Sequence, residues 1–305
     1  MILETTGAAA GALALRALAH RAILHGLRAP RLAHDGSHTR HAPDAARVHE
    51  VHLPGPRGRR LFGWFVTPGD APAPAVLAMH GWGANATTMW PLVPPLVAAG
   101  FAVLLLDARC HGASDGERFT SMPRFAEDIA AGLAWLARQP GVQADRLALV
   151  GHSVGAAASL LHAARLGGVR GVVSLSAFAH PQEVMRRFLA EKRLPFYPLG
   201  WYVLRHVQHV IGARFDEIAP LATVRRVRCP VLLVHGRDDL VAPFDDALRI
   251  QAAAAPGTAL LAVDGDHDLR DALAPQAGAV VDFLRAACDG RSDTITGIPS
   301  TGPGR

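Results

Sequence analysis

The chain has 305 residues, of which 50% are hydrophobic and 19% are charged, and its formal net charge is +5 at pH 7. This composition is typical of a folded domain with a large core and excludes a disordered or fibrous chain. Basic and acidic residues are interleaved through most of the sequence, so we expect no nucleic-acid partner despite the basic balance.

The amino-terminal part, residues 1–45, predicts an amphipathic helix and a linker. Residues 7–27 are rich in Ala and Leu, but Arg16, His20, Arg21 and His25 interrupt them before the ~20 apolar residues that a membrane span requires. We expect this helix to pack on the body or to make a weak contact with a membrane surface. Residues 31–43 are rich in turn-forming residues and histidines and predict a flexible linker.

From Arg47 onward, short apolar runs alternate with segments of helix length, which predicts a mostly parallel sheet covered by helices on both faces. Eight strands are expected, the first two as an antiparallel hairpin at one edge: 48–53, 61–66, 75–79, 101–106, 146–150, 169–175, 231–234 and 259–263. The helices of this core are expected at 86–99, 123–137, 154–166, 243–254 and 270–287. The core therefore covers residues 46–178 and 229–288.

Residues 179–228 are too many for a simple crossover between two parallel strands. Two helices, 182–192 and 199–211, are expected here, separated by Pro195 and Pro198. We predict that this insertion forms a small helical lid. Residues 289–305, with many Ser, Thr, Gly and Pro residues, are expected to be disordered.

A GxSxG pentapeptide, Gly151 to Gly155, follows one expected strand and leads into a helix. The two glycines permit the sharp turn that exposes the hydroxyl of Ser153 beside the positive end of the helix. Chance alone produces such a pentapeptide in roughly a tenth of similar chains, so its position between a strand and a helix is the stronger evidence. Ser153 is the predicted nucleophile.

A serine nucleophile needs a base, and the base needs an acid to orient it. The expected strand 231–234 is followed by HGRDD, and the strand 259–263 is followed by DGDHD. Because the carboxyl ends of parallel strands meet at one edge, His267 and either Asp238 or Asp239 are expected to reach Ser153. Three flanking carboxylates are expected to cap or solvate their loop: Asp264, Asp266 and Asp268.

The loop HGWGAN, residues 80–85, follows the expected strand 75–79. Its glycines allow the backbone to curl, so we expect the Trp82 N–H to form an oxyanion hole together with the Val154 N–H. Other side chains near these loops have structural roles as their first expectation, in backbone hydrogen bonds or in tying loops together: His80, Asp107, Arg109, His111, His152 and His235.

Over residues 61–287 the chain resembles the α/β-hydrolase superfamily, in particular serine esterases and lysophospholipase-like hydrolases. Four motifs match in order: HGWGAN, DARCHGASDG, GHSVG, and the pair HGRDD and GDHD. The resemblance implies the α/β-hydrolase fold, with Asp239 as the acid, His267 as the base, and neither metal nor organic cofactor. Cys110 stands where relatives usually have Gly, which predicts a slightly different loop path there.

These features predict a serine hydrolase that cleaves carboxylic ester bonds of small to medium acyl substrates. We expect the substrate pocket to be lined by His152, Phe188, Trp201 and Val241. A thioesterase, peptidase, lysophospholipase or acyltransferase would use the same three residues, and a non-catalytic binding protein on this scaffold is a further alternative. The expected partner is a small-molecule acyl ester.

The cysteines, Cys110, Cys229 and Cys288, are odd in number and far apart, without the CxxC spacing of a metal or redox site. We therefore expect neither a disulfide framework nor a zinc site, and small buried apolar side chains instead. Such cysteines fit a reducing compartment, so the predicted location is the cytoplasm, with membrane contact at most through the first helix.

Overall fold

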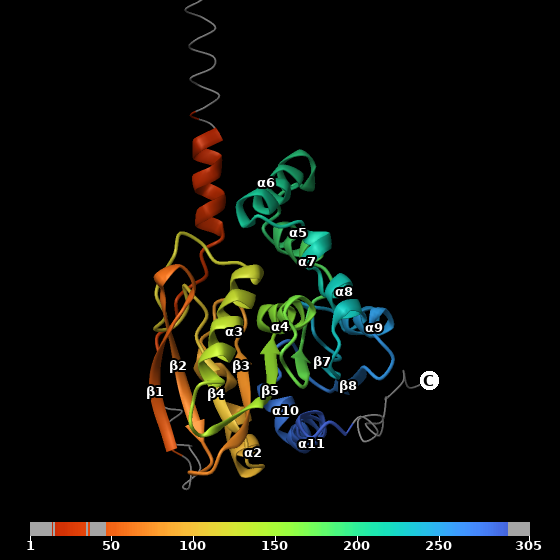
Figure 1. Cartoon of the computed structure of the whole chain (residues 1–305). Helices are drawn as coiled ribbons and strands as arrows, with labels where there is room; N and C mark the ends of the chain where they lie inside the picture. Colours follow the sequence, from red (N-terminus) through yellow and green to blue (C-terminus); the bar gives the residue numbers. More distant parts are fainter. Residues whose placement is uncertain (1–13, 15, 35, 37–46, 292–305) are drawn as a thin grey trace, which may run out of the picture.

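The computed structural model describes residues 14, 16–34, 36 and 47–291. Its centre is an eight-stranded sheet in the order β1-β2-β4-β3-β5-β6-β7-β8 (Figure 1). β1 pairs antiparallel with β2 and β2 antiparallel with β4, whereas every other neighbouring pair is parallel. The predicted hairpin and mostly parallel sheet are confirmed. The strands are β1 Arg47–Pro54, β2 Arg60–Thr67, β3 Ala73–Met79, β4 Ala102–Leu106, β5 Val142–His152, β6 Val172–Leu175, β7 Val231–Gly236 and β8 Ala259–Val263.

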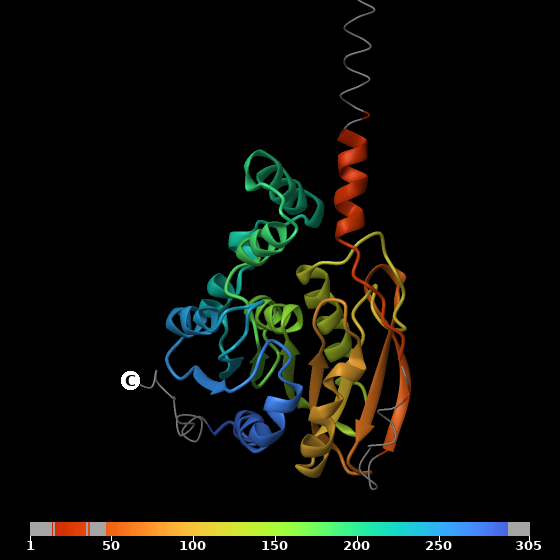
Figure 2. The same ribbon diagram turned by 180° about the vertical axis from the view of Figure 1, so that it is seen from behind.

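Helices cover both faces of the sheet, with α3 and α4 on one face and α2 and α11 on the other (Figures 1 and 2). The longer helices are α2 Val93–Ala98, α3 Met122–Leu136, α4 Val154–Arg165, α5 Pro181–Glu191, α6 Trp201–Ile211, α9 Phe244–Ala253 and α11 Ala277–Cys288. Short helical turns lie between them: η2 Pro56–Gly58, η3 Ala86–Leu92, η4 Phe196–Gly200, α7 Phe215–Ile218, α8 Pro220–Thr223, η5 Val224–Arg226, α10 Arg270–Leu273 and η6 Ala274–Gln276. A further helix precedes β1, over residues 16–26.

The hydrophobic core has two parts, because successive side chains of a strand point to opposite faces of the sheet. In β3, Leu77 belongs to the cluster that includes Phe125 of α3. Its neighbour Val76 belongs to the second cluster, with Leu96 of α2 and Phe283 of α11. Burial on both faces explains why the central strands are continuous apolar runs rather than alternating ones.

Two predicted helices are divided in the structure. The segment expected as one helix over 86–99 consists of η3 and α2, and Pro91 lies inside η3. The segment expected over 270–287 consists of α10, η6 and α11, with Pro275 in η6. Proline lacks the N–H that a continuous helix needs and clashes with the preceding turn, so the helical hydrogen-bond pattern changes at these residues.

The insertion between β6 and β7 contains the two expected helices, as α5 and α6, and three further short elements, α7, α8 and η5. It leaves the sheet at the carboxyl end of β6. α6 and the helix formed by residues 16–26 project from the same end of the molecule (Figures 1 and 2). Within the described residues, no helix combines the length and the apolar character needed to cross a bilayer.

The segment after the first helix is attached to the body. Arg31 donates hydrogen bonds to the carbonyl oxygens of Gly112 (3.0 Å) and Ser114 (2.8 Å). His34 Nε2 lies 2.8 Å from the Asp107 carboxylate. The prediction of a flexible linker is therefore wrong for residues 31–34, because the loop around Asp107 offers acceptors that a local sequence pattern does not reveal. Residues 37–43 of that linker, residues 1–13 and most of the predicted tail lie outside the described residues.

Candidate active site

Ser153 lies in a sharp turn between β5 and α4. Its backbone has φ 53° and ψ −115°, a conformation that non-glycine residues rarely adopt and that costs on the order of 1–3 kcal/mol. The Ser153 N–H donates to the carbonyl oxygen of Leu175 in β6 (2.8 Å), which fixes the turn against the sheet. The predicted order of strand, turn and helix is present, and Ser153 is 9% exposed.

The two glycines of the pentapeptide are sterically required. A Cβ atom on Gly151 would stand 2.4 Å from the carbonyl oxygen of Gly155, and one on Gly155 would stand 2.3 Å from that of Met79. Both distances join carbon to backbone oxygen, which no side-chain rotation can relieve. α4 can approach β3 and β5 this closely only because these positions lack side chains.

Replacing Gly155 by Ala is expected to lower the free energy of unfolding by about 3 kcal/mol, because the backbone must shift to relieve the overlap with Met79. Gly278→Ala is the matched control, since a Cβ at this α11 position meets no atom within 4 Å. Alanine should stabilise that helix by about 0.5 kcal/mol. Urea unfolding of both variants measures the difference, and equal stabilities would contradict the steric account.

His267 lies between Ser153 and Asp239. Its Nε2 is 3.0 Å from Ser153 Oγ, and its Nδ1 is 2.8 Å from Asp239 Oδ2. Asp239 follows β7 and His267 follows β8, so neighbouring strands deliver both side chains to the edge where β5 delivers the serine. The structure thus brings together the three residues expected from the sequence. Asp238 is exposed and is not in this arrangement.

The Asp239 carboxylate is held by four donors. Its Oδ1 accepts from the N–H groups of Val241 (2.9 Å) and Ala242 (2.8 Å), and its Oδ2 faces His267 and His235 Nε2 (3.3 Å). Burial alone would raise the pKa of Asp239. The hydrogen bonds from His235, His267 and the Ala242 N–H outweigh burial and hold this pKa well below its ordinary value. The carboxylate is therefore charged beside the imidazole.

His235 also contacts the Asp239 carboxylate, a role that the sequence did not reveal. Its Nε2 lies 2.7 Å from the carbonyl oxygen of Ala242 as well as 3.3 Å from Asp239. Both partners are acceptors, so this nitrogen carries the proton and donates. The sequence predicted only a structural role with backbone hydrogen bonds, and the second contact depends on the turn that brings Asp239 back over β7.

His152 contacts the loop that carries His267 rather than forming an open pocket wall. Its Nε2 donates to the backbone carbonyl of His267 (2.8 Å), and the two rings lie 5.1 Å apart. Burial lowers the pKa of His152 to about 4, so the ring is neutral at neutral pH. It fixes the loop that carries His267.

The buried neutral state of His152 predicts a pH-dependent stability. Between pH 6.5 and about 4 the unfolded chain binds a proton at this imidazole and the folded chain does not. Wild-type stability should therefore fall, relative to that of His152→Gln, by up to about 3 kcal/mol as the pH is lowered through this range. Glutamine preserves a donor of similar reach without titrating. Denaturant unfolding at several pH values measures this difference, and a constant difference would refute it.

The two amides predicted for the oxyanion hole belong to the residue after Ser153 and to the loop that follows β3. Val154 is the first residue of α4, so its N–H has no acceptor within the helix. In the described part of the chain, the Trp82 N–H makes no hydrogen bond, while the neighbouring Gly83 N–H donates to His111 Nε2 (3.2 Å). A Cβ added to Gly81 would lie 3.3 Å from Ser153 Cβ, which shows how closely this loop approaches the serine.

Two buried histidines fix the Trp82 loop. His80 Nδ1 donates to the Gly81 carbonyl (2.7 Å), and its Nε2 accepts from the Ala108 N–H (3.1 Å). His111 Nδ1 likewise donates to the Arg109 carbonyl (3.0 Å). Burial lowers the pKa of His80, and that of His111 to about 3, so both remain neutral and can use one nitrogen as donor and the other as acceptor.

Cys110 has φ 69°, in the left-handed region that glycine adopts freely. The loop thus keeps a glycine-like backbone at the position where relatives usually have Gly, so the predicted change of path is not required. The Cys110 Sγ accepts from the Glu117 N–H (3.1 Å). Cys110, Cys229 and Cys288 are free thiols, and the first two are only partly buried rather than buried as expected.

Of the remaining predicted pocket residues, two lie on the insertion and one lies beside Asp239. Phe188 is 57% exposed and packs near Lys192, and Trp201 is 48% exposed near Arg205. Both lie on α5 and α6, which stand away from the sheet (Figure 1). Val241 is half exposed, beside the acid that its N–H contacts. A pocket role for Phe188 and Trp201 would therefore need a movement of the insertion.

The order of the strands, the turn at Ser153 and the loops after β7 and β8 are those of the α/β-hydrolase class. A family model described as "Serine aminopeptidase, S33" matches residues 70–209. The uncharacterized protein Rv2307c of Mycobacterium tuberculosis is 30% identical over 214 residues, which cover 68% of each chain. Esterase YjfP of Escherichia coli is 26% identical over 227 residues, which cover 71% of this chain and 90% of that protein.

A solved structure gives the same result for the fold. The Pyrococcus furiosus esterase Pf2001 matches with a TM-score of 0.67 and 19% identity, over 84% of this chain and 98% of that one. The chain belongs to the α/β-hydrolase superfamily. Among the described residues, no group of three or more His, Cys, Asp or Glu side chains is arranged to hold a metal ion.

Proposed function

We propose that this chain is a serine esterase that hydrolyses carboxylic esters of small to medium acyl groups. The observation that carries the proposal is the hydrogen-bonded series Ser153–His267–Asp239, with 3.0 Å and 2.8 Å separations, at a strained turn. The names of the relative YjfP and of the structural neighbour Pf2001 agree with ester hydrolysis. No metal or organic cofactor enters the chemistry.

In the first half of the reaction, Ser153 Oγ attacks the ester carbonyl carbon while His267 Nε2 takes the hydroxyl proton. The charge on the carbonyl oxygen is held by the N–H groups of Trp82 and Val154. The tetrahedral intermediate then breaks its bond to the alcohol oxygen, which leaves with the proton from His267. An acyl group remains on Ser153.

In the second half, His267 removes a proton from water, and the hydroxide attacks the acyl carbon. The bond from carbon to Ser153 Oγ breaks, the serine oxygen regains the proton, and the acid is released. Asp239 stays charged throughout, because its pKa lies far below neutral pH, and it stabilises the imidazolium of each half-reaction.

The description of the family model makes amide hydrolysis at a peptide amino terminus the second candidate. Hydrolysis rates on three substrate classes distinguish an esterase from an aminopeptidase. The substrates are p-nitrophenyl acetate, butyrate and octanoate, the matching thioesters, and aminoacyl p-nitroanilides. We expect the highest kcat/KM with the acetate or butyrate ester. A kcat/KM for an anilide above that of every ester would replace esterase by aminopeptidase. Inactivity on all three classes, with intact protein, would favour a binding protein.

A further inference from the structure

The insertion presents an apolar surface to solvent at the end of the molecule far from β1 and the sheet centre. Six large hydrophobic side chains between positions 188 and 202 are 40% to 73% exposed, nearly half of all such exposed residues in the described chain. We call them the lid surface: Phe188, Leu194, Tyr197, Leu199, Trp201 and Tyr202. Isolated exposed apolar residues need no explanation, but a concentration of this kind marks a contact surface.

Basic side chains surround the lid surface. Arg186 lies 4.2 Å over the Phe196 ring, Lys192 5.6 Å over Phe188, and Arg205 5.9 Å over Trp201. In the part of the chain that the structure describes, these three side chains form no ion pair with a carboxylate. Their charge is therefore available to an anionic partner, and their stems lie along aromatic rings.

The positive charge of the chain is concentrated at this end. Residues 184–213 contain five Lys or Arg residues and one acidic residue, and residues 16–28 contain three Arg residues and no acidic one. The summed net charge of these two segments is larger than the formal net charge of the whole chain, which is +5. The rest of the chain therefore has a net negative charge. This charge favours a negatively charged partner at this end.

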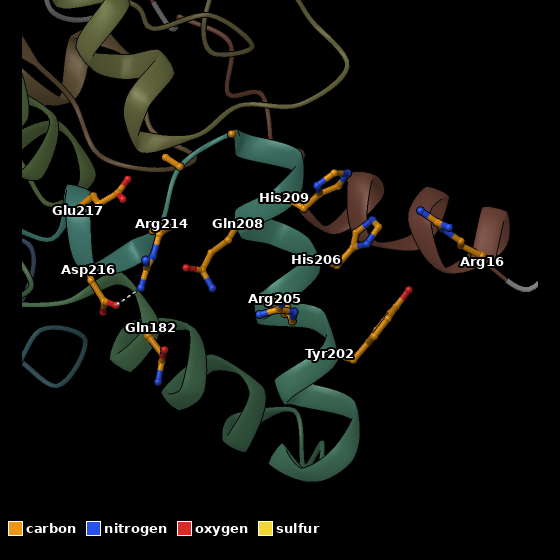
Figure 3. Close-up of a pocket in the computed structure, with 12 residues that line it drawn as sticks. Arg16, Gln182, Tyr202, Arg205, His206, Gln208, His209, Arg214, Asp216 and Glu217 are labelled. Carbon is orange, nitrogen blue, oxygen red and sulfur yellow. Dashed lines mark ion pairs between the residues drawn. The ribbon is translucent and has the colours of Figure 1, made fainter.

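The first helix extends the same surface. It lies beside α6 (Figure 3). His20 Nδ1 of this helix is 2.9 Å from His206 Nε2 of α6. A hollow of about 1080 Å³ adjoins this contact. Its basic lining residues include Arg16, Arg205 and His209, and Asp216 and Glu217 line another part of it. Leu18 of the first helix is 64% exposed. Apolar and cationic groups thus alternate across both elements.

We propose that the lid surface and the first helix dock on a bilayer that contains anionic lipid. Tyr and Trp side chains are suited to the headgroup level, where one part of the ring is apolar and the other wet. Lys and Arg side chains near a negative lipid surface add electrostatic attraction. The basic part of the hollow would receive a lipid phosphate. This proposal is independent of the reaction at Ser153.

A second copy of this chain is the main competing occupant. A symmetric dimer through the lid surface would place two segments of strong positive charge against each other, which is unfavourable. An anionic bilayer has the opposite charge and accommodates the same apolar groups. Charge complementarity therefore favours the bilayer.

The test uses flotation of the full chain with phosphatidylcholine vesicles, prepared with and without phosphatidylglycerol. We expect binding to vesicles with phosphatidylglycerol, and Lys192→Glu/Arg193→Glu should weaken it by about 20-fold or more, because each basic residue near such a surface contributes about fivefold. The matched control, Arg138→Glu/Arg225→Glu, makes the same charge change at exposed positions that precede β5 and β7, at the opposite edge of the sheet. It should bind within about twofold of wild type.

A second variant tests the apolar part. Leu194→Ser/Leu199→Ser changes two exposed side chains, which are 41% and 45% accessible, and should weaken vesicle binding about tenfold without loss of folding. Hydrolysis of a soluble ester by both lid variants should match wild type. Equal binding of wild type, lid variants and control would overturn the proposal. So would a concentration-dependent dimer that the lid variants lose, in the absence of vesicle binding.

Discussion

Ser153→Ala is expected to lower kcat for p-nitrophenyl acetate by at least about 10⁴-fold, with the fold unchanged. The substitution removes the one oxygen that His267 Nε2 contacts at 3.0 Å, and alanine keeps the size of the side chain close to that of serine. The rate that remains should reflect binding and the oxyanion hole alone. Steady-state kinetics with a circular dichroism spectrum measure both parts of this expectation.

Ser159→Ala is the matched control for this result. Ser159 lies in the same helix, α4, and its hydroxyl donates to the Gly155 carbonyl (2.8 Å) rather than to the imidazole. Its replacement should cost about 1 kcal/mol of stability and leave kcat within about twofold. If Ser153→Ala keeps a substantial part of the wild-type rate, the serine is not the nucleophile.

Asp239→Asn is expected to lower kcat by about 10⁴-fold. The Asn oxygen can still accept from the Val241 and Ala242 N–H groups, which leaves the amide NH₂ facing His267 Nδ1 and His235 Nε2. A donor at that position favours the tautomer of His267 that carries its proton on Nε2, and this tautomer cannot accept the serine proton.

Asp238→Asn tests whether Asp238, rather than Asp239, is the acid that orients His267. The Asp238 side chain is exposed, and its backbone N–H donates to the Gly265 carbonyl, which the substitution leaves in place. The substitution should therefore leave kcat within about twofold. Measurement of both variants on one ester settles the choice between two adjacent carboxylates. A large loss in the Asp238 variant with none in the Asp239 variant would reverse the assignment.

The parts of the site that the sequence could predict are those encoded by short motifs at strand ends. Ser153 follows from a pentapeptide whose glycines are needed within that same turn. Asp239 and His267 follow from loops after consecutive strands of a parallel sheet, because such loops necessarily emerge at one edge. The divided helices could also have been predicted, since Pro91 and Pro275 stand in the sequence.

The parts that could not be predicted depend on contacts between distant segments. The attachment of Arg31 and His34 requires acceptors that lie more than seventy positions away. The hydrogen bond from His152 to the His267 carbonyl spans 115 positions. Composition likewise cannot decide which face of a helix is buried, and for this reason the aromatic residues expected in the pocket were found exposed on α5 and α6.

In the proposed reaction, Ser153 carries the activated hydroxyl. Labelling of the wild-type chain with a fluorophosphonate, followed by peptide mass spectrometry, tests it most directly. We predict one covalent adduct on Ser153, and its formation should slow markedly in Asp239→Asn, because the imidazole then no longer activates the hydroxyl. An active enzyme whose Ser153 stays unmodified while another residue carries the adduct would contradict the account.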